Sequence, residues 1–292
     1  MTKKVIVRVV GGLGNQMFCY AAARRLAFAN DAELVLDTVT GFQSDPYNRS
    51  YQLNVFAIAG REATAGERLE PFPKPRRALL RAVSKAVPYD QRPYIQQEGL
   101  DFDARLLSRA VKGTVRIEGV WPGEGYFRDI EEKIRSEFVL KHPPHDPLNL
   151  ELSARISAGV SVGMHVRWFD MRSAIQNVSA EFYRRAAEEM KARLANPHFF
   201  VFSDNPEAAR EALQLRGDVT YVAHNDPDSG GIADFWLLRQ CDHFVIANST
   251  FSWWAAWLGA QSDKIVICPD PTHVRTAGWA AKGFVPENWL TL

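Results

Sequence analysis

Short apolar runs alternate with amphipathic segments along most of the chain. Near the start, the β-branched run at 5–10 leads into a glycine-rich turn at 11–14. Residues 15–30 then carry apolar side chains at helical spacing, and 32–37 is a second short apolar run. We interpret these segments as strand, turn, helix and strand, which together form one βαβ unit. Its crossover predicts a parallel sheet with helices on both faces.

The second half of the chain repeats this alternation. We expect strands at 161–167, 198–203, 219–222, 243–247 and 264–268, and helices at 180–194, 205–215, 232–240 and 253–259. Before it, the pattern is weaker and predicts strands at 94–97 and 114–120 and a helix at 126–138.

A proline cluster separates the two halves. Pro143, Pro144 and Pro147 cannot continue a helix or a central strand. We therefore expect an N-terminal domain at 1–147 and a C-terminal domain at 148–292. Two doubly wound α/β units predict a ligand in the cleft between them, at the carboxyl ends of the parallel strands.

Composition narrows the function classes. The chain has 292 residues, which suits two domains, and its 35 Lys and Arg nearly balance 34 Asp and Glu. This balance argues against a nucleic-acid partner. The three cysteines lie in apolar runs, which indicates buried thiols in a reducing compartment. The most apolar stretch, 251–260, is too short to span a bilayer, so we expect a cytoplasmic protein.

Segment 71–89 departs from this balance. It contains five basic residues and no acid, and Leu79, Leu80, Val83 and Val87 lie near helical spacing. The pattern predicts a basic amphipathic helix. Our hypothesis is that this helix makes peripheral contact with an anionic inner membrane. The alternative is a solvated surface helix.

The glycine-rich turn is the first candidate for ligand contact. Gly12, Gly14, Asn15 and Gln16 stand where a strand ends and a helix begins, so the backbone can approach a ligand and the helix can attract an anion. A tight structural turn explains the same residues. The segment is not a dinucleotide-binding fingerprint, because Met17 stands at the third glycine position.

The second candidate is the end of the expected strand 161–167. Alternation places His165 and Arg167 on one face, and an arginine at a strand end can hold a diphosphate through paired hydrogen bonds. Asp170 is expected to orient that arginine or to contact a sugar hydroxyl. A structural salt bridge is the alternative.

Two further polar segments follow expected strands. Asn248, Ser249, Thr250 and Ser252 crowd the start of an apolar helix, where they can cap the helix or cradle phosphates. In the segment 203–205, Ser203, Asp204 and Asn205 can accept hydrogen bonds from a purine or cap the next helix.

Metal binding is not favoured by the sequence. The triplets 101–103 and 226–228 contain Asp-x-Asp, but neither ends an apolar strand, and His142 and His145 are separated by prolines. We expect no metal site.

Together, these segments resemble the bacterial α-1,2-fucosyltransferase family, glycosyltransferase family 11. The resemblance rests on GGLGNQMF at 11–18, LVLD at 34–37, EGVWPGEGYF at 118–127, HVRWFD at 165–170, FVFSD at 200–204, DFWLLRQC at 234–241, HFVIANSTFSWWAAWLG at 243–259 and PENW at 286–289. It implies a GT-B-like fold, with two Rossmann-type domains facing across a cleft, and no metal or other cofactor.

The resemblance also implies residue roles. A GDP-sugar donor would bind mainly to the C-terminal half, with the loop 12–16 closing the cleft. The donor-binding residues would be His165 and Arg167 at the nucleotide and diphosphate, Ser203, Asp204 and Asn205 near the guanine, and Asn248, Ser249, Thr250 and Ser252 near the phosphates.

The implied reaction is inverting transfer of L-fucose from GDP-L-fucose to the 2-hydroxyl of a galactoside acceptor, in surface polysaccharide or lipopolysaccharide synthesis. Arg167 would stabilise the departing diphosphate. A carboxylate would help remove the acceptor proton, and the candidates are Asp37, Glu124 and Asp170. Trp121 and Tyr126 are expected either to line the acceptor side or to pack in the core.

The sequence departs from the family pattern at two places. Trp168, Phe169 and Met171 replace an expected Arg, Gly and Tyr, and Asn205 replaces an aspartate. One alternative is therefore another GDP-deoxyhexose as donor, and a second is a GDP-sugar-binding protein without transferase activity. A third is an NAD-dependent enzyme, motivated by the opening βαβ unit.

Overall fold

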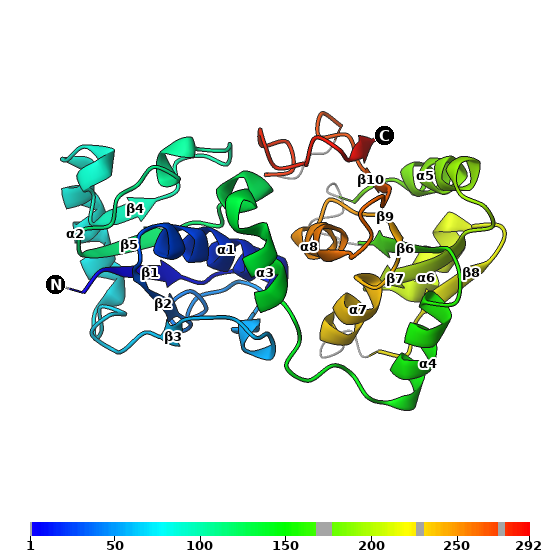
Figure 1. Cartoon of the computed structure of the whole chain (residues 1–292), viewed down its shortest axis with the longest axis horizontal. Helices are drawn as coiled ribbons and strands as arrows, with labels where there is room; N and C mark the ends of the chain where they lie inside the picture. The colour runs from blue at the N-terminus through cyan, green and yellow to red at the C-terminus, as the bar shows by residue number, and fades with distance from the viewer. Residues whose placement is uncertain (1, 168–176, 226–230, 274–277) are drawn as a thin grey trace. The chain divides into compact units, whose positions relative to one another are not determined.

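The computed structural model describes residues 2–167, 177–225, 231–273 and 278–292. The chain divides into two compact units (Figure 1). Unit 1 contains Met1–Lys141 and Ala281–Pro286, and unit 2 contains His142–Ala280 and Glu287–Leu292. This division differs from the boundary expected at 147, because the chain changes units after Lys141 and returns to unit 1 near its end.

Unit 1 is a parallel α/β unit. Its strands are β1 (Lys4–Arg8), β2 (Glu33–Asp37), β3 (Arg61–Glu62), β4 (Tyr94–Gln96) and β5 (Thr114–Glu118), in the spatial order β3-β2-β1-β5-β4. Its helices are α1 (Leu13–Ala29), α2 (Pro73–Lys85) and α3 (Glu131–Glu137). Single 3₁₀ turns lie at Leu53–Val55, Tyr89–Gln91, Ala104–Leu106, Glu124–Tyr126 and Arg128–Ile130.

The core of unit 1 forms where α1 packs on β1 and β2. Val5 and Val7 are fully buried, as are Met17, Phe18 and Leu26 of the helix. The β-branched run therefore becomes a central strand, since side chains on one face of β1 are covered by α1. The predicted helix at 126–138 is instead two 3₁₀ turns followed by the short α3.

The segment 281–286 joins unit 1 through close backbone contact. The ring of Phe284 lies 5.9 Å from that of Phe18, and the backbone of Lys282 accepts a hydrogen bond from Phe102. Gly123 has φ +110°, and a Cβ there would lie 2.4 Å from the carbonyl oxygen of Gly283. Only glycine fits at position 123, so the motif EGVWPGEGYF positions this returning segment.

Unit 2 is a second parallel α/β unit. Its strands are β6 (Ser161–Val166), β7 (His198–Ser203), β8 (Val219–Val222), β9 (His243–Val245), β10 (Val266–Cys268) and β11 (Leu290–Thr291), in the order β11-β10-β9-β6-β7-β8. Its helices are α4 (Pro147–Ile156), α5 (Ala180–Arg193), α6 (Pro206–Leu213), α7 (Gly231–Leu238) and α8 (Thr250–Leu258). The predicted strands and helices of this half lie within three residues of these bounds, whereas α4 and β11 were not predicted.

The core of unit 2 is built from β6, β7, α5 and α8. Val162, Met164 and Phe200 are fully buried in the strands, and Trp253 and Trp254 are fully buried in α8. These two tryptophans meet edge to face at 5.2 Å, which makes α8 a rigid, apolar element. All three cysteines are buried free thiols, as predicted.

Candidate functional site

The sheet of unit 2 changes direction beside β6. Strands β7 and β8 are added on one side of β6, and β9, β10 and β11 on the other. All these pairings are parallel, so the strands end at one common edge. A crevice at the carboxyl edge of such a switch point is where open α/β sheets bind ligands. The residues following β6, β7 and β9 are the three segments expected to bind the donor.

Arg167 pairs with Asp204 at this edge. The guanidinium nitrogen Nη1 lies 3.1 Å from the carboxylate oxygen Oδ2, and both side chains are partly exposed. Register explains the meeting, because Val166 of β6 is paired with Ser203 of β7. An arginine presents five N–H donors in a rigid fork, which is the geometry that suits an anionic ligand.

His165 is buried directly before Arg167. Burial, with a contribution from the charge of Arg167, lowers the pKa of His165 to about 3. Its ring lies 5.3 Å from that of Phe251 in α8, and among the described residues its Nδ1 has no hydrogen-bond partner. His165 is therefore a neutral side chain at physiological pH, and the cationic group of this strand end is Arg167.

Helix α8 begins at the same edge, after β9. Ser249 is its N-cap and accepts a hydrogen bond from the Phe251 backbone at 3.3 Å. The Ser252 hydroxyl donates to the backbone oxygen of Ser249 at 3.2 Å, and Asn248 is buried. Thr250 is the first helical residue. The positive end of the helix dipole at this N-terminus favours an anion.

The segment 203–205 caps the next helix, which is one of the two interpretations that the sequence left open. The Ser203 hydroxyl accepts from the Asn205 backbone at 3.1 Å, and the Asn205 side chain caps α6 by accepting from Ala208 at 3.1 Å. Asp204 points to Arg167 instead. Asn205 thus has a structural role as a cap, while Asp204 positions the arginine.

A polar cluster near the end of β8 was not identified from the sequence. Asn225 donates to the carboxylate of Asp234 at 2.7 Å and to Asn149 at 3.1 Å, and the His224 ring lies 3.0 Å from Asn149. Burial raises the pKa of Asp234. His224 and Asn225 follow β8, Asp234 lies in α7 and Asn149 in α4, so no single local motif contains the four residues. The one available signal was the run of polar residues that follows β8.

In unit 1, the predicted ligand loop is tightly bonded to its own unit. The buried Gln16 side chain donates to the backbone of Gly11 at 2.8 Å and of Ser50 at 2.9 Å, and accepts from Gln52 at 2.9 Å. Gly11 has φ +77°, whereas Gly12 is the extended N-cap of α1. Gly14 and Asn15 lie in the first turn of that helix. Gln16 therefore holds the 50–52 segment against the turn.

Asp37 is a buried carboxylate at the end of β2 in unit 1. Its Oδ1 accepts from the backbone of Val39 at 3.2 Å and of Thr40 at 2.9 Å, and its Oδ2 accepts from the Thr40 hydroxyl. These bonds cap the turn after β2. Such geometry favours a structural role over that of a general base.

The other unit 1 candidates belong to the motif at 118–127. Trp121 and Tyr126 are fully buried, with ring centres 5.7 Å apart, and the Tyr126 hydroxyl accepts from the Asp103 backbone at 2.7 Å. They therefore pack in the core, which was one of the two expectations. Glu124 lies at the start of a 3₁₀ turn, 3.6 Å from Arg128.

Several candidates lie outside the described residues. These are Asp170, the substituted positions Trp168, Phe169 and Met171, and the triplet 226–228. In the other triplet, Asp101 accepts from the Lys282 backbone and Asp103 caps a 3₁₀ turn. Within the described ranges, no group of three His, Cys, Asp or Glu side chains is placed to hold a metal. Nor does any described helix have the length and apolarity needed to cross a membrane.

Known proteins resemble this chain at the level of sequence. Residues 91–289 match the family model described as glycosyl transferase family 11. An α-1,2-colitosyltransferase of Escherichia coli is 29% identical over 99% of this chain and 98% of its own length. A galactoside α-(1,2)-fucosyltransferase 1 of Lagothrix lagotricha is 34% identical, over 56% of this chain and 49% of its own length.

Solved structures support the fold. The NodZ α-1,6-fucosyltransferase has a TM-score of 0.53 at 19% identity, over 94% of this chain and 98% of that one. Arabidopsis thaliana FUT1 has a TM-score of 0.55 at 13% identity, over 94% of this chain and 72% of that one. The fold is GT-B-like, with two parallel-sheet α/β units. The chain belongs to glycosyltransferase family 11 and is a glycosyltransferase.

Proposed function

We propose that this enzyme transfers L-fucose from GDP-L-fucose to the 2-hydroxyl of a galactoside, with inversion, in the synthesis of a surface polysaccharide or lipopolysaccharide. The observation that carries this proposal is the arrangement at the switch point of unit 2. There the partly exposed Arg167 and the N-terminus of α8 lie at the ends of neighbouring strands. The α-1,2 linkage is supported by the names of the relatives, and GDP-fucose by the ligand of the NodZ structure.

The chemistry needs stabilisation of a leaving group. When the bond between the anomeric carbon and the GDP oxygen breaks, negative charge collects on the diphosphate and the sugar acquires oxocarbenium character. Arg167, held by Asp204, and the backbone N–H groups of α8 supply positive charge and hydrogen bonds to that diphosphate. The neutral His165 packs beside them without adding charge. No metal is assigned a role in this mechanism.

The acceptor hydroxyl must lose its proton as it attacks. Of the three carboxylates considered, Asp37 has both oxygens bonded within its own loop. We therefore favour Glu124 or Asp170 as the base. Replacing each by its amide and comparing the pH dependence of kcat/KM distinguishes them, since loss of the base removes the acidic limb of the profile.

Arg167 is tested by substitution. Arg167→Ala should lower kcat/KM for transfer from GDP-fucose by about 10²–10³-fold, the typical cost of removing one donor that stabilises developing charge. Arg167→Lys should recover part of the loss, because a lysine keeps the charge but not the paired hydrogen bonds. Arg184→Ala, on the exposed side of α5, is the matched control. Unchanged turnover in Arg167→Ala excludes the assigned role.

The start of α8 is tested by binding. Ser249→Ala and Thr250→Ala should weaken GDP affinity in calorimetry, while an unchanged affinity would leave Ser249 as a helix cap and Thr250 as the first residue of the helix. The same titration addresses the alternative of a binding protein without activity. That alternative predicts GDP binding by the wild type with no product from any donor and acceptor tested.

The donor sugar requires a direct comparison. The 29% identity to a colitosyltransferase extends over nearly the whole chain, which makes GDP-colitose the specific competitor of GDP-fucose. Colitose is fucose without its 3-hydroxyl, so the ratio of the two kcat/KM values measures recognition of that hydroxyl. A ratio favouring GDP-colitose replaces fucose in the proposal and leaves the α-1,2 transfer intact.

A further inference from the structure

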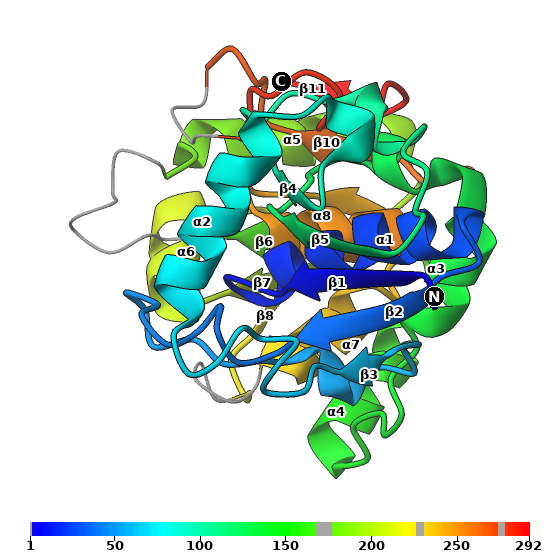
Figure 2. The same cartoon turned by 90° about the vertical axis from the view of Figure 1, so that its left-hand side faces the viewer.

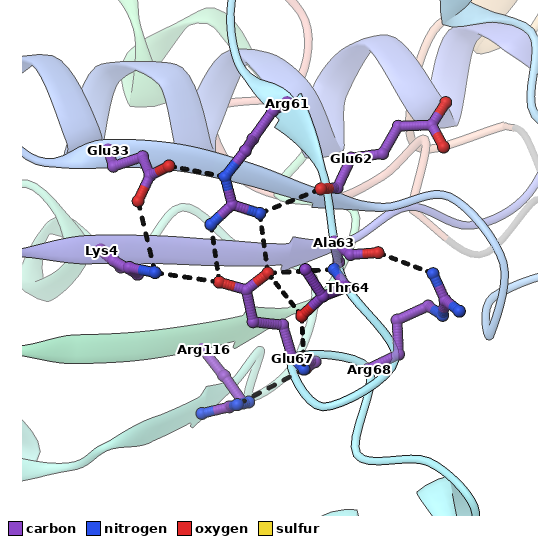
Figure 3. A network of polar contacts seen from close by, with 9 residues as sticks. All are labelled: Lys4, Glu33, Arg61, Glu62, Ala63, Thr64, Glu67, Arg68 and Arg116. Atoms are coloured by element: carbon purple, nitrogen blue, oxygen red, sulfur yellow. Dashed lines mark hydrogen bonds and ion pairs between the residues drawn. The ribbon is translucent and has the colours of Figure 1, made fainter.

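One face of the sheet in unit 1 is charged. On the face away from α1, Lys4 and Arg8 of β1 lie beside Glu33 and Asp37 of β2 in register. Figure 3 shows the centre of this network, where Glu67 accepts from Lys4 at 3.1 Å and from Arg61 at 2.7 Å. Between these charges lies a small buried apolar cluster of Ile6, Val35 and Ala63. The charged positions around it need polar partners, because a charge covered by apolar side chains would lose its partner.

Helix α2 covers the adjoining part of this face with its polar side. Arg77 is buried and donates to the Thr40 hydroxyl at 3.0 Å. Arg81 donates from Nε to the carboxylate of Glu118 at 3.0 Å, and the buried Ser84 hydroxyl accepts from the Tyr94 backbone at 3.1 Å. The spacing of 77, 81 and 84 is that of one helix face. The helix is therefore polar toward its own unit, and Figure 2 shows it next to β4.

The opposite side of α2 is apolar and exposed. We call this side the α2 stripe. Its residues are all exposed, and helical spacing places them on one face: Phe72, Pro75, Ala78, Leu79, Ala82, Val83 and Ala86. Phe72, Leu79 and Val83 are 64%, 65% and 51% exposed. This arrangement is the reverse of an ordinary surface helix, whose apolar side faces the core.

Basic residues border the α2 stripe. With 3.6 residues per turn, Arg76 lies along one edge and Lys74 and Lys85 along the other, and all three are exposed. The segment 71–89 contains no acidic residue. A second copy of the chain docked through the same stripe by a two-fold axis would bring like charges together, which is unfavourable. An anionic lipid surface matches both the apolar stripe and its basic borders.

We propose that the α2 stripe docks on an anionic lipid bilayer, with Phe72, Leu79 and Val83 at the level of the acyl chains and Lys74, Arg76 and Lys85 at the headgroups. The helix has 13 residues, so it lies in the plane of the interface and does not span it. The surface belongs to unit 1, and the docking does not depend on the proposed donor or acceptor.

Vesicle sedimentation tests the docking. The full-length enzyme should bind vesicles of phosphatidylcholine with phosphatidylglycerol, and binding should fall without phosphatidylglycerol or at high salt. Leu79→Gln with Val83→Gln should lower the partition coefficient by about tenfold or more. The matched control is Leu148→Gln with Leu150→Gln in α4, which removes comparably exposed apolar side chains and should leave binding unchanged.

The basic borders are tested in the same assay. Replacing Lys74, Arg76 and Lys85 by Gln should lower the partition coefficient by about fivefold for each charge. The control replaces Arg184, Lys191 and Arg193 of α5 by Gln, with the same change in net charge, and should bind almost normally. Equal losses in the two triple variants would indicate attraction by net charge alone and would overturn the docking site.

Insertion is read directly with a fluorophore. Because the three native cysteines are buried, a cysteine introduced by Val83→Cys can be labelled selectively with an environment-sensitive dye. Its emission should shift to the blue on phosphatidylglycerol vesicles, and that of a dye at Leu148→Cys should not. Absence of vesicle binding by the wild type overturns the proposal. So does a concentration-dependent dimer that Leu79→Gln with Val83→Gln abolishes, since a second copy would then occupy the stripe.

Discussion

His165 and Arg167 are two residues apart at one strand end, yet His165 is buried and neutral whereas Arg167 is partly exposed and charged. His165 is enclosed by β6 and α8, with the ring of Phe251 beside it, and burial lowers its pKa to about 3. Arg167 lies beyond the strand, partly exposed, with a carboxylate partner. The positive charge of this edge is therefore placed two residues beyond the histidine, on the partly exposed side chain of Arg167.

The buried histidine predicts a pH dependence of stability. Unfolding returns the pKa of His165 to its ordinary value of 6.5, so between that pH and about 3 the unfolded chain binds one more proton than the folded chain. The free energy of unfolding should consequently fall as the pH falls, by up to about 1.4 kcal/mol per pH unit from this group. Urea denaturation between pH 7.5 and 5 should show a shallower fall for His165→Phe. Parallel curves for the two proteins would contradict the assigned neutrality.

Gly123 tests the contact that returns segment 281–286 to unit 1. Its φ of +110° and the 2.4 Å from a substituted Cβ to the Gly283 oxygen both disfavour any side chain. Gly123→Ala should lower the free energy of unfolding by more than about 2 kcal/mol. Gly66→Ala is the control, because a Cβ there meets nothing within 4 Å. Similar urea midpoints for both variants would show that the segment is not held by this contact.

At the scale of elements, the parallel strands were the most predictable features, because a strand buried on both faces forms a continuous apolar run. The run at 198–203 gives β7 at its predicted bounds. The helix predicted at 126–138 shows the opposite case, since Phe127 and Phe138 lie at helical spacing but belong to 3₁₀ turns and a helix end. The orientation of α2 could not be predicted from the sequence either. Periodicity identifies an apolar stripe, but it does not show which side of the helix faces the sheet.

In the charged sheet face of unit 1, we predict that replacing Glu67 lowers the free energy of unfolding. Its side chain, 16% exposed, bonds both Lys4 and Arg61, and the hydrogen bond from Arg61 lowers its pKa. Glu67→Gln should destabilise the protein by about 1–3 kcal/mol at neutral pH, because the partly exposed Lys4 and Arg61 lose the carboxylate that they share. The loss should shrink on acidification, because the stabilisation by the wild-type carboxylate is complete above its unfolded pKa and declines as the pH falls toward its lower folded pKa.

The control for this network is a solvated ion pair. Glu188 is 74% exposed and pairs with Lys191, three residues further along α5, at 2.9 Å. Glu188→Gln should change the free energy of unfolding by no more than about 0.5 kcal/mol. Equal effects of Glu67→Gln and Glu188→Gln in urea denaturation at pH 7 would mean that the sheet-face network stabilises the fold no more than a surface ion pair does.

At the scale of the whole molecule, the sequence predicted two α/β units but not how the chain is shared between them. Prolines mark the first crossing near 142–147, whereas the return at Ala281–Pro286 depends on contacts with Phe18 and Gly123 that lie more than a hundred residues away. The positions of the residues proposed to bind the donor were predictable, because they lie at or just after the ends of apolar strands. The cluster of Asn149, Asn225 and Asp234 was not, because α4 and α7 bring it together.

Because the two units have separate sheets, we predict that GDP slows hydrogen exchange more in unit 2 than in unit 1. A ligand that binds only the folded form stabilises by about 2.7 kcal/mol at a hundred times its Kd, and local openings of the unit that holds it become correspondingly rarer. Hydrogen exchange should therefore slow at the ends of β6, β7 and β9 and at the start of α8, with little change in β1 and β2. Arg167→Ala should remove the effect at the same GDP concentration, because the diphosphate loses its cation. Protection confined to β1, β2 and the turn at 11–16 would place the nucleotide in unit 1 and overturn the donor site.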